Sequence, residues 1–362
     1  MTKFRSSTPV SAPASAQTST PVGIKDVARA AGVSPATVSR VLGHGPVSEE
    51  LRLKVEDAVK ASGYRPNLSA RRLRSQNTRT IGLIVADIRN PFFTAVSRVV
   101  EDLAYAKGMR VVLCNTDENP EREAFYLRSM QEERVTGLIA TPTQTMLKRL
   151  LKAPPLDIPM ILVDRTLPGG RFDSVVIDNH QTATQLVEHL IATGRRRIAG
   201  LFGNSSSTGH DRMAGYCDTL QRHGLEVFAH LVRPYAQEAE KQFPEIWAQD
   251  RPDAIITSNS VLGSGLMRAV HTMGLKIPDD VALASFDDEP WTSLIEPGLT
   301  VVAQPVHQIG RDAMQLLFDR IRDPGAAPRA VQLPGQLIVR GSTAPVHQTS
   351  PNLPPHPEPV EG

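Results

Sequence analysis

The chain has 362 residues, 40% of them hydrophobic, and a formal net charge of only +2. It is long enough for a small domain and two lobes with separate cores, and it lacks the run of about 18 apolar residues that a membrane helix needs. Cys114 and Cys217 are the only cysteines, which excludes a disulfide framework and a cysteine-rich metal site; we expect no cofactor. Residues 1–22 are rich in Ser, Thr, Ala and Pro and lack the apolar segment of a secretory signal. We therefore expect a disordered N-terminal extension on a cytoplasmic protein.

Residues 24–42 contain two short helical patterns joined by a tight turn. Gly32 ends the first, because a residue without a β-carbon adopts a positive φ at low cost. Ser34 supplies an N-cap oxygen for the second, and Pro35 suits its first helical position. The apolar positions have helical spacing: Ile24, Val27, Ala28 and Ala31 in the first pattern, Val38, Val41 and Leu42 in the second.

Two short helices joined in this way are typical of a helix-turn-helix DNA reader, although alone they would also suit an all-helical core. The N-terminal outer face of the second helix would enter a major groove, and the predicted DNA contacts there are Pro35, Ala36, Thr37, Ser39 and Arg40. A third helix is predicted from Ser48, expected to be its cap, to Gly63. Together the three helices form a predicted headpiece over residues 23–66.

Positive charge is concentrated next to these helices. Residues 23–79 hold 11 Lys and Arg against 5 acids, a charge of +6, whereas the residues after Arg79 sum to −6. The stretch from Arg65 to Arg74 has too few apolar residues to bury itself, so we expect it to fold only against a partner. This asymmetry points to a polyanion such as DNA.

From Thr80 onward, apolar runs alternate with amphipathic helical patterns such as 92–108, 122–134, 179–194 and 211–224. The predicted buried strands are Ile81–Val85, Arg110–Cys114, Gly137–Ala140, Met160–Val163, Ser174–Ile177, Ile198–Phe202, Ala254–Thr257 and Val281–Phe286. Strands and helices in this alternation predict parallel, doubly wound α/β sheets, and the number of strands requires two of them.

Four segments carry a resemblance to the LacI/GalR family of bacterial transcription regulators: Val-Ser-Pro-Ala-Thr-Val-Ser-Arg-Val-Leu, Gly-Tyr-Arg-Pro-Asn, Ala-Arg-Arg-Leu and Thr-Ile-Gly-Leu-Ile-Val, in the family's order. The resemblance implies an all-α helix-turn-helix headpiece at 23–66, a hinge helix and linker at 67–79, and a two-lobed, periplasmic-binding-protein-like α/β core at 80–344. Lobe 1 would hold residues 80–178 and 305–332, and lobe 2 residues 179–304 and 333–344. Residues 345–362 form a Pro-rich tail that we expect to be disordered.

In that family the hinge helix inserts a leucine into the minor groove at the centre of a pseudo-palindromic operator. By position this leucine is Leu73, with Ala70 close to the groove wall and Arg71 and Arg74 beside it. An apolar wedge flanked by cations is what a kinked minor-groove complex requires; the alternative is an ordinary basic linker. The tail shows no leucine heptad, so we expect a homodimer.

Ligands of open α/β sheets bind outside the carboxyl ends of the strands. The family's effector contacts fall on such positions, and Trp291 is added from a neighbouring loop: Phe92, Phe93, Asp164, Arg165, Arg212, Asn259, Asp287, Trp291 and Gln304. Arg212 and Asp287 are expected at loop–helix junctions, where a structural role is less pressing. Phe93 could instead be a packing residue, and Asp164 or Gln304 could make hydrogen bonds between the lobes.

The segments 286–292 and 299–305 resemble the sugar-acid branch of the family, which includes gluconate and ketogluconate regulators, although Ser260 replaces an acid found in many members. With Arg165 and Arg212 available for a carboxylate, we expect a sugar acid as effector. The predicted function is a repressor whose operator affinity changes when the effector binds between the lobes. The alternatives are a sugar-binding protein without a regulatory role and a purine- or nucleoside-responsive corepressor-type regulator.

No enzymatic constellation stands out in the sequence. The 10 histidines are scattered, and Gly263-Ser264-Gly265 lacks the strand–turn–helix context of a nucleophile elbow. We therefore expect a protein that is not an enzyme.

Overall fold

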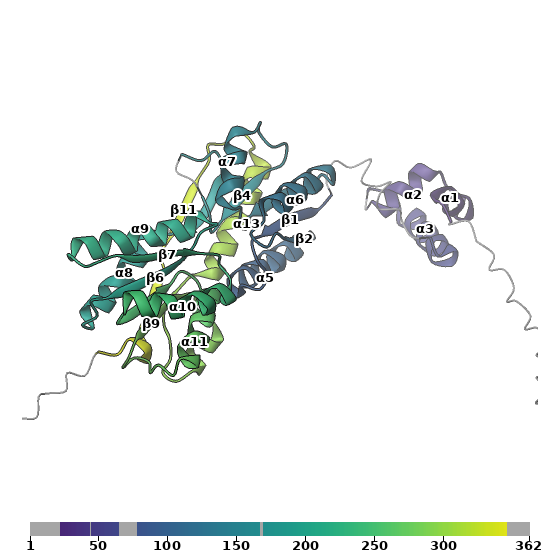
Figure 1. The fold of residues 1–362 in the computed structure, drawn as a ribbon. Helices are drawn as coiled ribbons and strands as arrows, with labels where there is room; N and C mark the ends of the chain where they lie inside the picture. Colours follow the sequence, from purple (N-terminus) through teal and green to yellow (C-terminus); the bar gives the residue numbers. More distant parts are fainter. Residues whose placement is uncertain (1–21, 44, 65–77, 167–168, 346–362) are drawn as a thin grey trace, which may run out of the picture. The chain divides into compact units, whose positions relative to one another are not determined.

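The computed structural model describes residues 22–43, 45–64, 78–166 and 169–345. The chain divides into two compact units, one ending at Gln76 and the other beginning at Asn77 (Figure 1). Each unit is described by itself. Within the described residues, no helix is both long enough and apolar enough to cross a membrane.

The first unit is a three-helix headpiece of α1 (Ile24–Ala31), α2 (Pro35–Leu42) and α3 (Glu49–Ser62). Gly32 ends α1 with a φ of 65°, and the Ser34 hydroxyl accepts a hydrogen bond from the Thr37 amide at 3.1 Å, so both predicted end signals are confirmed. Ser48 precedes α3, but its side chain makes no capping hydrogen bond. The acidic Glu49 and Glu50 in the first turn favour the positive end of that helix dipole instead.

Lobe 1 of the second unit is a fully parallel sheet with helices on both faces. Its strand order is β11-β5-β4-β3-β1-β2. One face packs against α5 and α13, and the other against α6 and α7. The elements are β1 (Thr80–Val85), α5 (Pro91–Ala106), β2 (Arg110–Asn115), α6 (Pro120–Glu132), β3 (Gly137–Ala140), α7 (Gln144–Lys152), β4 (Met160–Val163), β5 (Asp173–Ile177), α13 (Val306–Arg322) and β11 (Ala330–Leu333).

Lobe 2 repeats this plan with strand order β12-β10-β9-β8-β6-β7, except that β12 pairs antiparallel to β10. Helices α10 and α11 cover one face, and α8 and α9 the other. The elements are α8 (Asn179–Ala192), β6 (Ile198–Gly203), α9 (Ser207–Arg222), β7 (Phe228–Val232), α10 (Ala236–Asp250), β8 (Ala254–Thr257), α11 (Ser260–Thr272), β9 (Ala282–Phe286), α12 (Pro290–Leu294), β10 (Thr300–Ala303), β12 (Gln336–Ile338) and the 3-10 helix Gly341–Thr343.

Three short connections carry the chain between the two sheets: from β5 to α8, from β10 to α13, and from β11 to β12. Each lobe is therefore assembled from segments that are distant in sequence. One detail differs from the expectation: Arg212 does not open its helix, because α9 begins at Ser207 and Arg212 lies one turn further in.

Candidate functional site

The outer face of α2 presents the residues predicted to contact DNA. Val38 and Val41 hold the opposite face of the helix in the headpiece core. The predicted contacts are exposed or partly exposed: Pro35, Ala36, Thr37, Ser39 and Arg40. Because Ser34 fixes where α2 begins, the small side chains of its first turn form a defined surface that can approach base edges.

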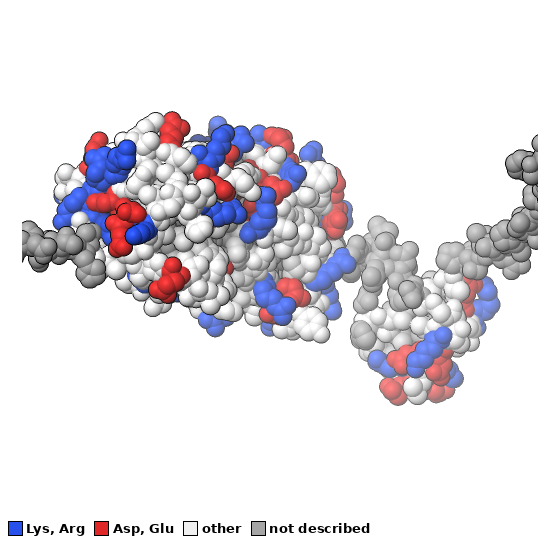
Figure 2. All heavy atoms as spheres, turned by 60° about the horizontal axis from the view of Figure 1, so that its bottom comes forward, with Lys and Arg blue, Asp and Glu red and all other residues white. Residues whose placement is uncertain are grey.

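The headpiece helices carry little net charge. Residues 23–64 hold six basic and five acidic side chains, and Figure 2 shows both signs on this unit. Three of the cations pair with acids of their own helix: Arg29 with Asp26, Arg52 with Glu49 and Lys54 with Glu50. Most of the +6 comes from five arginines in residues 65–79, where there is no acid. The predicted contacts Ala70, Arg71, Leu73 and Arg74 lie outside the described residues.

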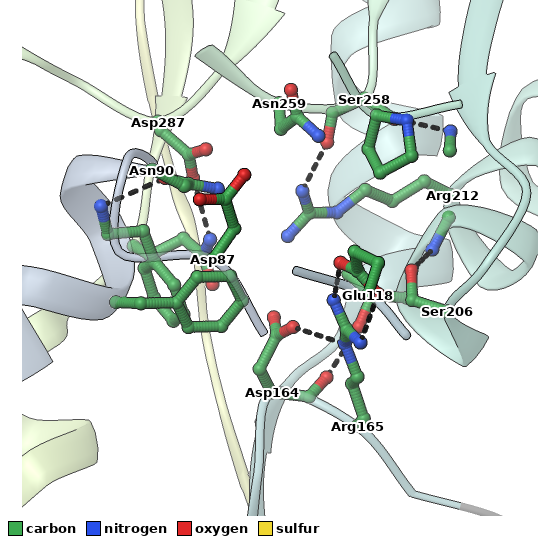
Figure 3. A pocket seen from close by; sticks show the side chains of 17 residues that line it. Asp87, Asn90, Glu118, Asp164, Arg165, Ser206, Arg212, Ser258, Asn259 and Asp287 are labelled. Atoms are coloured by element: carbon green, nitrogen blue, oxygen red, sulfur yellow. Dashed lines mark hydrogen bonds and ion pairs between the residues drawn. The ribbon is translucent and has the colours of Figure 1, made fainter. Parts of the chain in front are cut away.

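A pocket lies between the two lobes, where loops follow strands of both sheets (Figure 3). Eight of the predicted effector contacts line it: Phe92, Phe93, Asp164, Arg165, Arg212, Asn259, Asp287 and Gln304. Trp291 does not. The chain turns into α12 after Glu289, and Trp291 packs there against the core of lobe 2 and lines a second pocket.

Arg212 reaches from α9 toward the middle of this pocket (Figure 3). It is 2% exposed, and its guanidinium lies 3.9 Å from the centre of the Phe286 ring. Nε donates to Asn179 at 2.8 Å and one terminal nitrogen to the Ser258 carbonyl at 2.6 Å, whereas Nη2 has no partner among the described residues. Burial lowers the pKa of Arg212, and the nearby carboxylates of Asp287 and Asp164 offset this lowering only in part. An acceptor on a ligand would satisfy Nη2.

Arg165, in contrast, is already neutralised by acids. Its guanidinium donates to both carboxylate oxygens of Glu118 and lies 3.3 Å from an Asp164 oxygen. Burial alone would lower the pKa of Arg165, but Glu118 and Asp164 outweigh it and hold the pKa above its ordinary value. Burial also raises the pKa of Asp164. Arg165 is therefore not the free carboxylate receptor that the sequence suggested.

Asp287 is fixed by two donors at the end of β9. The Ser260 amide donates to one carboxylate oxygen at 3.2 Å, and the Gln304 side chain donates to the other at 2.7 Å. Gln304 thus orients Asp287 within lobe 2, and among the described residues its side chain makes no hydrogen bond to lobe 1. The contact between the lobes at Asp164 uses its main chain, because its carbonyl accepts from the Thr208 hydroxyl at 2.5 Å.

Three acidic pocket residues share an uncommon backbone conformation. Glu118, Asp164 and Asp287 have φ values of 56°, 67° and 75°. Left-handed φ angles disfavour residues with a β-carbon, and such strain tends to persist at functional sites. Asp164 and Asp287 come directly after β4 and β9, Glu118 comes three residues after β2, and all three line the pocket.

The aromatic wall combines packing with pocket lining. Phe92 and Phe93 contact each other edge to face with ring centroids 5.2 Å apart, and both belong to the core of lobe 1. The Arg165 guanidinium lies 5.7 Å from the Phe93 ring centre. Phe93 therefore packs in lobe 1 and lines the pocket, and its contact with an effector stays a prediction.

The predicted effector contacts leave out several polar residues of the pocket: Asp87, Asn90, Glu118, Ser206, Thr208 and Ser258. Asp87 lies just beyond the end of β1, so the rule that found Asp164 and Asp287 could have found it. Asn90 caps α5 through its side chain, bonding the Phe92 amide at 3.0 Å. The small hydroxyl residues carry no comparable signal.

Comparison with curated proteins gives relatives that align over most of the chain. The HTH-type transcriptional regulator PtxS of Pseudomonas putida is 36% identical, covering 92% of this chain and 99% of its own. The ribose operon repressor of Halalkalibacterium halodurans is 35% identical (88% and 96%), and the regulator KdgR of Bacillus subtilis is 33% identical (88% and 97%).

Solved structures give the same architecture. The lac repressor dimer bound to operator and an anti-inducer matches with a TM-score of 0.79 at 26% identity, covering 90% of this chain and 100% of that one. The complex of the regulator CelR with cellobiose matches with a TM-score of 0.65 at 28% identity (89% and 99%). Residues 23–67 match the bacterial regulatory proteins of the lacI family, and residues 187–343 match the periplasmic binding protein-like domain. The chain belongs to the LacI family of DNA-binding transcription regulators.

Proposed function

We propose that this protein represses transcription in the bacterial cytoplasm by binding an operator as a homodimer, and that a sugar acid bound between the lobes changes its DNA affinity. The exposed face of α2 supplies the major-groove contacts, and the segment around Leu73 the minor-groove contacts. An effector that binds one lobe arrangement better shifts the operator affinity, by about 5- to 150-fold for couplings of about 1–3 kcal/mol.

The proposal of a sugar acid rests on the guanidinium of Arg212, whose Nη2 lacks a hydrogen-bond acceptor among the described residues. This guanidinium is buried, has no carboxylate bonded to it, and keeps Nη2 without a partner among the described residues. A ligand carboxylate placed there would supply the missing acceptor and a compensating charge. Asp287 and Asp164, on either side of the pocket, would accept hydrogen bonds from the hydroxyl groups of the same ligand.

A neutral sugar is the second candidate, because the charged lining is mainly acidic. Asp87, Glu118, Asp164 and Asp287 stand against only Arg165 and Arg212, a formal balance that favours hydroxyl groups over anions. The ribose operon repressor is among the relatives, and a LacI family regulator from Enterococcus faecium, 27% identical, was solved with bound ribose.

Matched ligands distinguish the two candidates. An operator is selected from random DNA, and its affinity for the full-length protein is measured with gluconate, glucose or ribose. If the site binds a sugar acid, gluconate changes the operator affinity more than glucose does. Arg212→Lys then weakens gluconate binding more than it weakens operator binding. The control is Arg98→Lys on the exposed face of α5. Response to glucose or ribose alone would replace the sugar acid with a neutral sugar, and sequence-independent DNA binding would refute the repressor.

A further inference from the structure

A second, more open pocket, called the outer pocket, lies beside the effector pocket. Both lobes contribute to it, and Asp87 lines both pockets. The residues that matter for its chemistry are Arg89 from lobe 1 and Tyr235, Ala236, Gln237, Ser260, Val261, Arg268 and Trp291 from lobe 2.

Two helices begin at this pocket. Tyr235 precedes α10 without capping it through its side chain, and no acceptor is found among the described residues for the amides of Ala236 and Gln237. The Val261 amide in the first turn of α11 likewise has no acceptor among the described residues. Both helices are long, at 15 and 13 residues. Unsatisfied amides at a helix N-terminus, together with the helix dipole, favour an anion.

A buried hydroxyl points independently to a ligand. Ser260 is 1% exposed, and its Oγ has no hydrogen-bond partner among the described residues. Its main-chain amide is occupied by Asp287, so the hydroxyl is the group left over. Buried polar atoms are normally satisfied, and an oxygen-rich ligand in this pocket would satisfy this one.

Two arginines line the pocket, and each is already paired with an acid. Arg89 holds the Asp87 carboxylate through Nε and Nη2, and Nη2 also lies 3.3 Å from an Asp117 oxygen, whereas within the described part of the chain Nη1 has no acceptor. Arg268 is 57% exposed and contacts Glu240 through Nε at 3.3 Å. Asp87 is the acid that lines the pocket, and Arg89 already neutralises it.

We propose that this outer pocket binds a phosphate group, either as inorganic phosphate or as the phosphoryl group of a sugar phosphate. Helix amides, a hydroxyl and guanidinium groups approach from several elements, which suits a tetrahedral ion with several acceptor oxygens better than a planar carboxylate. Tyr235 and Trp291 also line the pocket, where the Arg89 guanidinium lies 5.3 Å from the centre of the Tyr235 ring. Because Arg89 and the two helices belong to different lobes, the phosphate favours the closed arrangement of the lobes. The site is a second ligand site, separate from the proposed effector site.

Titration calorimetry of the full-length protein tests the site with inorganic phosphate, ribose 5-phosphate and, as the neutral comparison, ribose. We expect Arg268→Gln to weaken phosphate binding about fivefold and Ser260→Ala to weaken it measurably, with Arg98→Gln unchanged as the matched control. Tighter binding of ribose 5-phosphate than of inorganic phosphate and ribose identifies a phosphoryl group on an organic ligand. Equal binding of the two phosphates identifies inorganic phosphate.

The proposal is overturned if neither phosphate compound binds at about 10 mM, or if Arg268→Gln and Ser260→Ala, both still folded by circular dichroism, bind phosphate as the parent does. Operator and gluconate binding are measured on the same variants. Neither should change in these variants if the two sites are separate. In the parent protein, the absence of a gluconate response with phosphate binding intact refutes the sugar-acid proposal alone, and a gluconate response without phosphate binding refutes only the outer site.

Discussion

Asp287 combines a left-handed backbone with a carboxylate held by Ser260 and Gln304. Asparagine tolerates that backbone nearly as well as aspartate, so Asp287→Asn removes the charge while sparing the turn. We expect effector affinity to fall about 10- to 100-fold, as for the loss of a hydrogen bond to a charged group. Calorimetry with the effector measures the change, and thermal unfolding verifies the fold.

The matched control is Asp102→Asn, an exposed acid of α5 that pairs with Arg98. It should leave effector and operator affinity unchanged. Equal effector binding by Asp287→Asn and the parent would remove Asp287 from the effector site.

Glu289 is a half-buried acid whose pKa is raised to about 7, first by burial and then by Asp287 and Asp288. The folded protein therefore binds more protons than the unfolded chain between the ordinary glutamate pKa and about 7. The contribution of protonated Glu289 to stability is present at low pH and is lost as pH rises through about 7. Glu289→Gln should reduce this loss.

Urea unfolding at about pH 5.5 and about pH 8 measures the effect. The parent should lose more stability between these values than Glu289→Gln, and the difference between the two proteins should be larger at the higher pH. Parallel changes in the two proteins would show that Glu289 titrates alike in the folded and unfolded states.

For single residues, the place of a side chain after a predicted strand was a better guide to the pocket than its expected role in binding a ligand. Asp164 and Asp287 were placed because they follow apolar strands, and both line the pocket. The prediction that Arg165 is available for a ligand carboxylate was wrong. Its partner Glu118 follows a different strand, and the sequence gives no sign of their contact. Trp291 was misplaced because a short helix, α12, was taken for a loop.

Among the elements, the turn between α1 and α2 depends on one glycine. Gly32 has a φ of 65°, and its β-position is free of contacts, so Gly32→Ala is strained by the backbone rather than by crowding. We expect a loss of about 1–2 kcal/mol in headpiece stability, and a smaller loss for Gly32→Asn because asparagine enters the left-handed region more readily. Hydrogen exchange of the α1 and α2 amides in the full-length protein measures headpiece stability, and exchange should be slowest in the parent, faster in Gly32→Asn and fastest in Gly32→Ala. Equal exchange rates in the parent and in Gly32→Ala would contradict the prediction that the turn depends on Gly32.

Burial accounts for most, but not all, of which strands the sequence predicted. Each of the eight expected strands is present. Seven of them are apolar runs covered on both faces, but β2 is a half-exposed edge strand and not the buried strand that was expected. The sequence analysis did not expect β10, although this strand is largely buried. It also missed β7, an edge strand in which exposed and partly buried residues alternate, and β11 and β12, which are short and partly exposed. Burial in these edges depends on neighbours that come from distant segments.

For the whole molecule, a few hydrogen bonds hold the lobes together around the pocket. The Tyr235 hydroxyl donates to the Asp117 carbonyl at 3.1 Å, the Thr166 amide to Ser207 Oγ at 3.2 Å, and the Gln144 amide to the Ser205 carbonyl at 2.9 Å. Since each joins lobe 1 to lobe 2, each stabilises the closed arrangement. Their small number makes the balance between open and closed lobes sensitive to a ligand.

Tyr235→Phe removes one of these bonds and keeps the ring. A hydrogen bond contributes about 0.5–1.5 kcal/mol, so we expect effector affinity to fall about 2- to 10-fold because the closed form is less populated. Small-angle scattering should show a larger radius of gyration without effector. Tyr105→Phe, at a residue 78% exposed on α5, is the control. Unchanged affinity and radius in Tyr235→Phe would show that this bond does not limit opening.

The distribution of charge predicts how DNA binding depends on salt. Figure 2 shows basic and acidic side chains interspersed over the visible face of the core, and the headpiece helices are nearly neutral, so the arginines of residues 65–79 must supply most of the attraction to phosphates. Replacing Arg71 and Arg74 by Gln should reduce the slope of log affinity against log salt by about 2 for each protomer. The control replaces Arg98 and Arg322, which are 74% and 78% exposed in the core unit, and should leave the slope unchanged. Fluorescence anisotropy over a range of potassium chloride gives both slopes, and an equal reduction in the two variants would mean that the core surface, not the linker, attracts the DNA.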